Sequence, residues 1–153
     1  MTNPSVCLFC QIVAGQADAS LVLRDAWVTA FMDVHPVTPG HVLVVPNRHA
    51  ADLQALDEES AEALLPAARR VGEALRQCGV PCDGLNLLLA DGVVAGQSVF
   101  HVHLHVIPRV RGDGFGLRRP LGSLRSPGRA ALESTAAALR KCLEATDRVS
   151  GMG

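Results

Sequence analysis

The chain has 153 residues, 48% of them hydrophobic, so one compact domain can form a sizeable core without disulfide bonds. The formal net charge of −1 argues against binding to nucleic acid or to a membrane surface through bulk charge. No apolar run reaches the ~18–20 residues of a transmembrane helix, and the first residues do not resemble a signal peptide. With an odd number of cysteines, five, these features predict a cytoplasmic protein rather than a secreted, disulfide-bonded one.

Five β-prone runs of apolar residues, bounded by turn residues, predict five strands. In chain order they are residues 21–24, 27–33, 41–45, 85–89 and 99–107, with Asp25 and Ala26 at the turn between the first two. One long helix is expected between the third and fourth strands, and a last helix over about residues 129–144. This order predicts an α+β domain, in which an antiparallel sheet has helices packed on it.

The long helix has two possible starts. Asp57 and Ser60 are both suitable N-caps for a helix that runs to about Cys78, where a glycine and a proline follow. Pro66 lies inside this helix if the start is early. The helix then either kinks at the proline or begins properly near Leu65.

Three of the six histidines alternate with apolar residues in the run 100–108. Strand side chains alternate between two faces, so His101, His103 and His105 would share one face, about 6.6 Å apart from one to the next. The residues between them are apolar and would face a core: Val102, Leu104 and Val106. Histidine acts as a base, a nucleophile or a metal ligand near neutral pH, so the pattern predicts a functional site. A solvated strand face is the simpler alternative.

The residues around these histidines are suited to binding an anion. Gly92 and Gly96 permit a tight backbone that brings N–H groups close to a ligand, and Gln97 and Ser98 add side-chain donors. Together they predict a phosphate site. The arginine-rich stretch that follows is either a solvated loop or a grip on the substrate. Its members are Arg109, Arg111, Arg118, Arg119, Arg125 and Arg129, with Asp113 the only acid between them.

Cysteine spacing predicts a metal site near the start of the chain. Cys7 and Cys10 form a C-x2-C pair, which suits one tetrahedral zinc ion. The alternative is a pair of buried thiols. Cys78 and Cys82 flank a turn with glycine and proline and form a weaker metal candidate, whereas Cys142 is expected to pack on the last helix.

Three blocks of the sequence resemble the histidine-triad (HIT) superfamily, in order and at fitting separations. They are His101-Val102-His103-Leu104-His105-Val106-Ile107, which is similar to the signature His-φ-His-φ-His-φ-φ (φ is hydrophobic), residues 33–46, and residues 7–15. The bacterial Hint-like and Fhit-like branch is indicated, because His105 stands where the nucleotidyltransferase branch has glutamine. The resemblance covers about residues 5–116. It implies one HIT domain over 1–153, with the Gly/Pro/Arg-rich segment and the C-terminal helix at 117–147.

This resemblance implies a homodimer, in which two five-stranded sheets join into one ten-stranded sheet. It also implies an enzyme that breaks a bond at the α-phosphorus of a nucleoside phosphoramidate or a dinucleoside polyphosphate. His103 matches the nucleophile, which would carry a covalent nucleotidyl group until water releases a nucleoside monophosphate. His105 would contact the phosphoryl oxygens and help at the leaving group. His101 and His41 complete the catalytic set, and His41 would belong to the network that fixes the histidine tautomers.

The resemblance also assigns substrate-binding residues. Asp33 matches a residue that hydrogen-bonds both ribose hydroxyls, with a strand-end turn residue as the alternative. Gly96, Gln97 and Ser98 would hold the phosphate and stabilise charge on its oxygens. Four apolar residues match positions that sandwich the base, although core packing is the alternative: Phe9, Ile12, Phe31 and Val34. A purine nucleotide is expected, with adenine and guanine left open because the pocket is apolar.

By the same resemblance, His49 and His101 would join the two cysteines Cys7 and Cys10 as ligands of one zinc ion. Four protein ligands leave no open position, so this zinc would be structural, and no organic cofactor is expected. Ala90 departs from the pattern, because Hint-like members commonly have an asparagine there that touches the phosphate. The run 91–97 looks closer to the Fhit branch, whose substrates are dinucleoside polyphosphates.

Three rival functions stay open. A dinucleoside polyphosphate phosphorylase would use phosphate in place of water. A metallohydrolase would bind one catalytic zinc through all three alternating histidines, but a strand would spread them over some 13 Å, whereas Zn–N bonds are about 2 Å long. A non-catalytic nucleotide-binding or adaptor protein would hold its ligand without turnover. Membrane and nucleic-acid partners are not expected.

Overall fold

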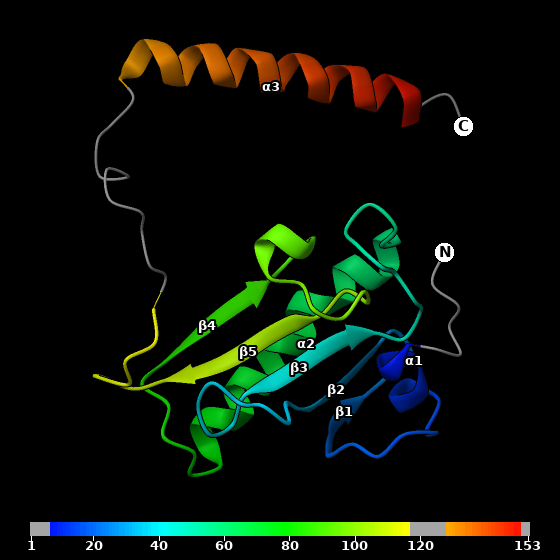
Figure 1. Cartoon of the computed structure of the whole chain (residues 1–153), viewed down its shortest axis with the longest axis vertical. Coiled ribbons are helices and arrows are strands. Elements are labelled where there is room, and N and C mark those ends of the chain that lie inside the picture. Colours follow the sequence, from blue (N-terminus) through cyan, green and yellow to red (C-terminus); the bar gives the residue numbers. More distant parts are fainter. Residues whose placement is uncertain (1–6, 117–127, 151–153) are drawn as a thin grey trace. The chain divides into compact units, whose positions relative to one another are not determined.

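The computed structural model describes residues 7–116 and 128–150, with side chains up to residue 142. The chain divides into two compact units, the first ending at Phe115 and the second beginning at Gly116. A five-stranded antiparallel sheet forms the centre of the first unit (Figure 1). Its strands are β1 (Leu21–Arg24), β2 (Val28–Met32), β3 (Val42–Pro46), β4 (Gly84–Leu89) and β5 (Leu104–Arg109). Their spatial order is β1-β2-β3-β5-β4, which confirms the predicted α+β class and the antiparallel sheet.

Strand β3 lies in the middle of the sheet, and every one of its residues is buried. Val42 and Val44 belong to one core cluster, whereas Leu43 and Val45 belong to another. Because strand side chains alternate, the two clusters lie on opposite faces of the sheet. His105 pairs directly with Leu43 across β5 and β3, so His105 shares the face of the second cluster.

The long helix α2 (Glu58–Gln77) covers the first face. It begins after the N-cap Asp57, whose carboxylate accepts a hydrogen bond from the Ser60 N–H at 2.9 Å. Pro66 therefore lies inside the helix, and the alternative start near Leu65 is excluded. The helix buries Leu64, Ala67, Ala68, Val71 and Leu75 against Val28, Ala30, Val42, Val44 and Val106 of the sheet. Full burial of each Leu or Val stabilises the fold by about 1.5–3 kcal/mol.

The second face carries a short helix, α1 (Leu8–Val13), that the sequence pattern did not reveal. Its six residues are too few for helical periodicity to be recognised. Arg24 on β1 donates hydrogen bonds to the carbonyls of Ile12 and Val13 at the end of the helix, which ties α1 to the edge of the sheet. The apolar side of α1 packs into the second cluster, which contains Cys7, Phe9, Ile12, Phe31, Leu43 and Val45.

Strand β5 begins later than the sequence predicted. One strand was expected over residues 99–107, but the ladder starts at Leu104. Just before it, the Val102 N–H donates to the carbonyl of Ala50 at 2.7 Å, in the segment after β3, and not to a strand of the sheet. Of the three alternating histidines, only His105 lies in the strand. The expected ladder of three imidazoles on one strand face is therefore wrong.

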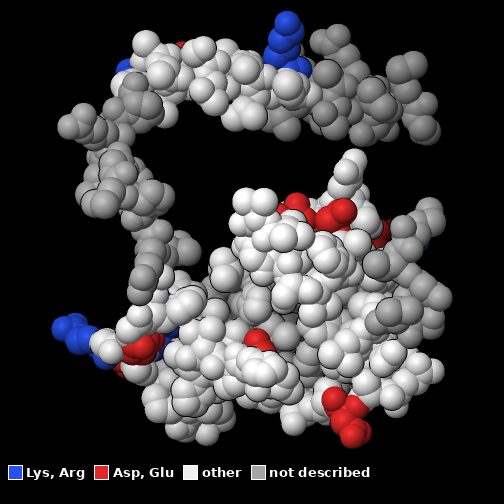
Figure 2. All heavy atoms as spheres, in the orientation of Figure 1, with Lys and Arg blue, Asp and Glu red and all other residues white. Residues whose placement is uncertain are grey.

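The second unit contains helix α3 (Arg129–Ser150), which starts where it was predicted and continues past the expected end at residue 144. In the described parts of the chain, no helix has the length and apolar character needed to span a membrane. On the face drawn in Figure 2, the charged side chains of the described residues form small separate groups rather than one basic field. The predicted basic stretch lies partly outside the described residues, which do not include Arg118, Arg119 and Arg125.

Candidate active site and metal cluster

A chain of polar side chains crosses the α1 face of the sheet. Asp33 Oδ2 lies 3.5 Å from His41 Nδ1, and His41 Nε2 lies 2.9 Å from His105 Nδ1. The ring of His105 is in turn 4.9 Å from the ring of His103, measured between centroids. The fold thus brings His41, which stands just before β3, next to two of the three alternating histidines.

Hydrogen bonds determine the tautomers in this chain. The Val37 N–H donates to His41 Nδ1 at 3.1 Å, so the His41 proton must be on Nε2, from which it is donated to His105 Nδ1. His105 therefore carries its own proton on Nε2. Burial lowers the pKa of His41, against a smaller opposing effect of Asp33, and burial lowers the pKa of His105 to about 4. Both rings are neutral near pH 7, and His105 presents an N–H donor.

His103 has the opposite arrangement. Its Nδ1 lies 2.8 Å from the carbonyl oxygen of His101, and a carbonyl can only accept, so the proton is on Nδ1. In the neutral tautomer the lone pair is then on Nε2, and the ring meets the ring of Phe9 edge-on at 5.4 Å. An imidazole held in this orientation with a defined lone pair is suited to nucleophilic attack.

His103 and His105 line a cavity of about 380 Å³ on this face. Most of the residues that were predicted to bind substrate line the same cavity, namely Phe9, Ile12, Phe31, Asp33, Val34 and Ser98. Phe9, Ile12 and Phe31 are also core residues, as the alternative interpretation of them predicted, whereas Val34 is 83% exposed. The remaining lining residues were not predicted: Leu8, Asp18, Ala19, Met32, His35, Leu43 and Val99. His35 follows Asp33 by two positions, but Asp18 carries no signal in the sequence.

Internal hydrogen bonds stabilise the glycine-flanked loop next to the cavity. Val93–Ala95 form one turn of 3-10 helix, and Gly92 and Gly96 on either side have positive φ angles of 88° and 96°. The buried amide of Gln97 closes the loop: Oε1 accepts from the Gly92 N–H at 2.8 Å, and Nε2 donates to the carbonyls of Ala51 and Val99 at 2.7 and 3.2 Å.

The predicted phosphate contacts change in consequence. Both amide hydrogens of Gln97 are in use, and the Gly96 N–H donates to the Val93 carbonyl at 3.0 Å. These two residues therefore support the loop in this arrangement rather than present donors to a phosphate. Ser98 is the one of the three predicted phosphate ligands that lines the cavity.

The four predicted metal ligands converge. Cys7, Cys10, His49 and His101 each offer one ligand atom, and all four atoms lie within 4.8 Å of one another. The His49 and His101 Nδ1 atoms are 3.3 Å apart, and the sulfur–nitrogen distances are 3.3, 3.4 and 3.5 Å. A tetrahedral zinc site with ordinary bond lengths requires edges of about 3.3 Å between nitrogens and about 3.5 Å between nitrogen and sulfur. The donor set and its spacing therefore fit zinc.

The surroundings of the cluster also suit a metal. His101 Nε2 lies 2.8 Å from the Pro46 carbonyl, so the proton is on Nε2 and Nδ1 faces the cysteines as a free ligand atom. Without a cation, burial and then the neighbouring Cys7 raise the pKa of the Cys10 thiol to about 11, and a bound zinc ion would oppose this by stabilising the thiolate. The weaker candidates Cys78 and Cys82 belong to none of the metal-competent groups found among the described residues.

The arginine predicted to follow the histidines is occupied elsewhere. The Arg109 guanidinium donates to Asp113 at 2.6 Å through Nε, and also to Asn86 and to the Phe115 carbonyl. It lies 4.8 Å from the Phe115 ring centroid. Arg109 thus holds the loop after β5 and does not line the cavity. Arg111 is exposed and does not line it either, and Arg129 is exposed on α3 of the second unit.

Comparisons with known proteins identify the family. A family model described as HIT domain matches residues 14–112. The Bacillus subtilis protein named Protein hit is 43% identical over 111 residues, which cover 72% of this chain and 76% of that protein. A Zn-bound histidine triad family protein from Mycobacterium smegmatis has a TM-score of 0.71 and 35% identity, covering 96% of this chain and 99% of that chain. A histidine triad nucleotide-binding protein from Candida albicans has a TM-score of 0.82 and 27% identity, covering 92% and 99%. This chain belongs to the HIT, or histidine triad, family.

Proposed function

We propose that this protein is a nucleotide hydrolase, which cleaves at the α-phosphorus through a covalent nucleotidyl group on His103. The observation that carries the proposal is the tautomer of His103 at the cavity wall. Its Nδ1–H is bonded to the His101 carbonyl at 2.8 Å, so its nucleophilic Nε2 is available to a ligand in the cavity. The similarity to a histidine triad nucleotide-binding protein supports a nucleotide as the ligand.

In the first displacement, the His103 Nε2 lone pair attacks the α-phosphorus and forms an N–P bond. The bond between phosphorus and the leaving group breaks, the leaving atom accepts a hydrogen bond from His105 Nε2–H, and an amine leaving group takes its proton from solvent water. The positive charge that develops on the His103 ring is stabilised by the His101 carbonyl, which accepts from Nδ1–H. Burial keeps the His105 ring neutral, so this ring acts as a hydrogen-bond donor and keeps its proton.

In the second displacement, water attacks the nucleotidyl phosphorus. The attacking water loses a proton to the solvent as the new O–P bond forms, and His105 Nε2–H donates a hydrogen bond to a phosphoryl oxygen. The N–P bond breaks, its electron pair returns to His103, and a nucleoside monophosphate leaves. His105 keeps its Nε2 proton throughout, and both histidines return to their starting state. Two displacements with a good nucleophile replace one difficult attack by water.

Substrate is held along the cavity. Asp33 would accept hydrogen bonds from the two ribose hydroxyls, and Ser98 would donate to the phosphate. The purine would lie among four apolar residues, Phe9, Ile12, Phe31 and Val34. Nucleoside phosphoramidates and dinucleoside polyphosphates both fit this scheme, because their difference lies in the leaving group. Ala90 offers no side-chain donor toward it and is only 8% exposed.

A structural zinc completes the proposal. Cys7, Cys10, His49 and His101 would hold it, and zinc would supply a cross-link between α1, the segment after β3 and the segment before β5. His101 then has two tasks, because its Nδ1 belongs to the metal cluster while its carbonyl orients His103. The Zn-bound relative from Mycobacterium smegmatis supports this assignment.

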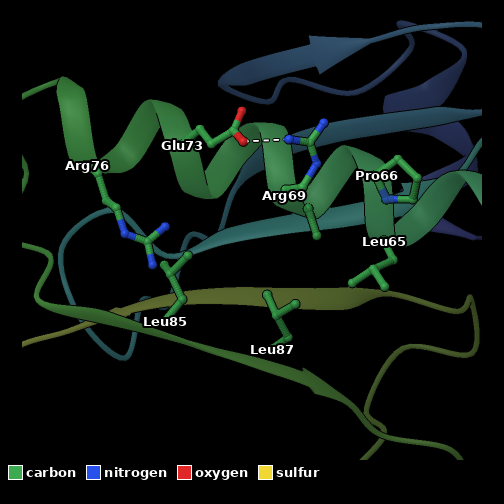
Figure 3. A pocket seen from close by; sticks show the side chains of 8 residues that line it. Leu65, Pro66, Arg69, Glu73, Arg76, Leu85 and Leu87 are labelled. Carbon is green, nitrogen blue, oxygen red and sulfur yellow. Dashed lines mark hydrogen bonds and ion pairs between the residues drawn. The ribbon is translucent and has the colours of Figure 1, made fainter.

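A homodimer through strand β4 is the expected assembly. Strand β4 is at the edge of the sheet, and its Leu87 and Leu88 are 42% and 40% exposed, which is unfavourable for an uncovered apolar edge. Next to it, a hollow of about 590 Å³ lies between β4 and α2 (Figure 3). Leu65, Leu85 and Leu87 point toward this hollow in Figure 3. Two copies joined along β4 would cover this surface and form a ten-stranded sheet.

The geometry argues against a metallohydrolase that uses all three alternating histidines. His101 Nδ1 lies with the cysteines, whereas His103 and His105 line the cavity.

Measurements of turnover distinguish the other two alternatives, the phosphorylase and the non-catalytic binding protein. Wild type and His103→Ala should be incubated with adenosine 5′-phosphoramidate and, separately, with diadenosine tri- and tetraphosphate, with and without inorganic phosphate.

We expect AMP release that depends on His103 and does not require phosphate. Release of a nucleoside diphosphate only with added phosphate would indicate a phosphorylase. Nucleotide binding without turnover by the wild-type protein would contradict the hydrolase and indicate a binding or adaptor protein. His103→Ala should keep its fold, measured by its thermal transition, because the ring is replaced by a smaller side chain at a cavity wall.

A further inference from the structure

We propose that Asp18 reads the edge of the nucleobase and makes the protein select guanine over adenine. This inference rests on the proposed function, because it concerns the same cavity. Asp18 lies between α1 and β1 and lines the cavity that also contains His103 and His105. It was not among the residues predicted to contact the substrate.

The neighbours of Asp18 place it at the apolar end of the cavity. Ala17 and Ala19, on either side of it, pack against the cluster that contains Phe9 and Phe31. The Ser20 carbonyl accepts the Met32 N–H at 3.0 Å, so this segment runs beside the end of β2 that leads to Asp33. A base sandwiched by the apolar residues, with its ribose at Asp33, would therefore lie next to the Asp18 carboxylate.

The Asp18 carboxylate is free to bind a ligand. Asp33, the other acid of the cavity, accepts the His35 N–H at 2.8 Å and lies close to His41. Asp18 has no hydrogen bond or ion pair with any residue that the structure describes, and its side chain is at the exposed rim. His35 also lines the cavity. An imidazole can donate or accept, so it does not distinguish the two purines.

The hydrogen-bonding pattern of a carboxylate decides between the bases. Guanine presents two neighbouring donors, N1–H and the 2-amino group, which match the two acceptor oxygens of a carboxylate in a bidentate pair. Adenine presents one donor, the 6-amino group, beside the N1 acceptor, whose lone pair would face a negative charge. Bidentate pairs to base edges discriminate by about 1–3 kcal/mol, and an exposed rim gives the lower end, which corresponds to about a five- to tenfold preference.

The test compares guanosine and adenosine 5′-phosphoramidate, which share the same leaving group, and takes the ratio of their kcat/KM values. The variant is Asp18→Asn, because an asparagine side chain presents one acceptor and one donor, so it no longer matches the two neighbouring donors of guanine and can pair with either base. The control is Glu62→Gln, which removes one exposed carboxylate on α2, away from the cavity. We expect wild type and Glu62→Gln to prefer guanosine about five- to tenfold, and Asp18→Asn to lose this preference.

An unchanged ratio in Asp18→Asn, or a wild-type protein that turns over both substrates equally, would overturn the role of Asp18. Failure of the proposed hydrolase function looks different, because wild type would then release neither monophosphate. In that case the same three proteins are compared by equilibrium binding of GMP and AMP. A guanine preference that disappears in Asp18→Asn would still support the assignment, and equal affinities in wild type would reject it.

Discussion

The buried amide of Gln97 should hold the loop beside the active site together, and its removal should be costly. In Gln97→Leu, the Gly92 N–H and the Ala51 carbonyl lose hydrogen bonds of 2.8 and 2.7 Å at a position that is only 4% exposed. The Val99 carbonyl still accepts the His101 N–H at 2.9 Å, so it keeps a partner. Each buried group left without a partner costs about 1–3 kcal/mol, so the free energy of unfolding should fall by about 3 kcal/mol.

Urea denaturation measures this loss, and the midpoint should decrease by roughly 1.5 M for a typical slope. Ser98→Ala is the matched control, because Ser98 lines the cavity but takes no part in the hydrogen bonds of the Gln97 amide. Its free energy of unfolding should stay within about 0.5 kcal/mol of wild type, while its KM for the nucleotide rises. A Gln97→Leu variant as stable as wild type would refute the stabilising role of the Gln97 amide. A Ser98→Ala variant with unchanged KM would refute the phosphate contact.

Three further predictions concern pH, metal and assembly. Burial lowers the pKa of His105 from 6.5 to about 4, so between these pH values the unfolded chain takes up a proton that the folded chain does not. The free energy of unfolding should therefore be level above pH 7 and fall as the pH drops through 6.5 toward 4. Urea midpoints at a series of pH values measure this fall, and it should be smaller in His105→Asn; an equal fall in both proteins would contradict it. Elemental analysis should find one zinc ion per chain. Chelated wild type and the Cys10→Ser variant should both have a lower thermal midpoint than untreated wild type. A metal content near zero after growth and purification with zinc would exclude the site. Leu87→Glu on β4 should convert dimers into monomers in light scattering, whereas Leu132→Glu on α3, which is similarly exposed, should not; a monomeric wild type would reject the interface.

Periodicity and turn chemistry were sufficient to predict the sheet and the long helix. Asp57 is a good N-cap, and its bond to the Ser60 N–H determines the helix start despite Pro66. The local sequence pattern gave a wrong prediction where contacts between distant segments determine the structure. The alternation of His101 to Val106 imitates a strand, but the backbone before Leu104 bonds to Ala50, far away in the sequence.

The candidate site shows the same division. Residue types and the family resemblance indicated His103, His105 and Asp33, and the structure places all three at one cavity. They could not show that the Gln97 amide faces the loop, since a glutamine in a glycine-rich run has the same appearance whether it binds a phosphate or a carbonyl. Nor could they reveal Asp18, whose position depends on how the segment after α1 lies against β2.

The most direct test of the central claim is detection of the covalent intermediate. Wild type should be mixed with excess adenosine 5′-phosphoramidate, quenched under mildly alkaline denaturing conditions that preserve phosphoramidate bonds, and measured by intact-mass and peptide mass spectrometry. We expect a transient mass gain of one adenylyl group, located on the peptide that contains His103 and absent in His103→Ala. Rapid AMP release with no adenylyl-protein at any time, or an adenylyl group on another residue, would contradict it.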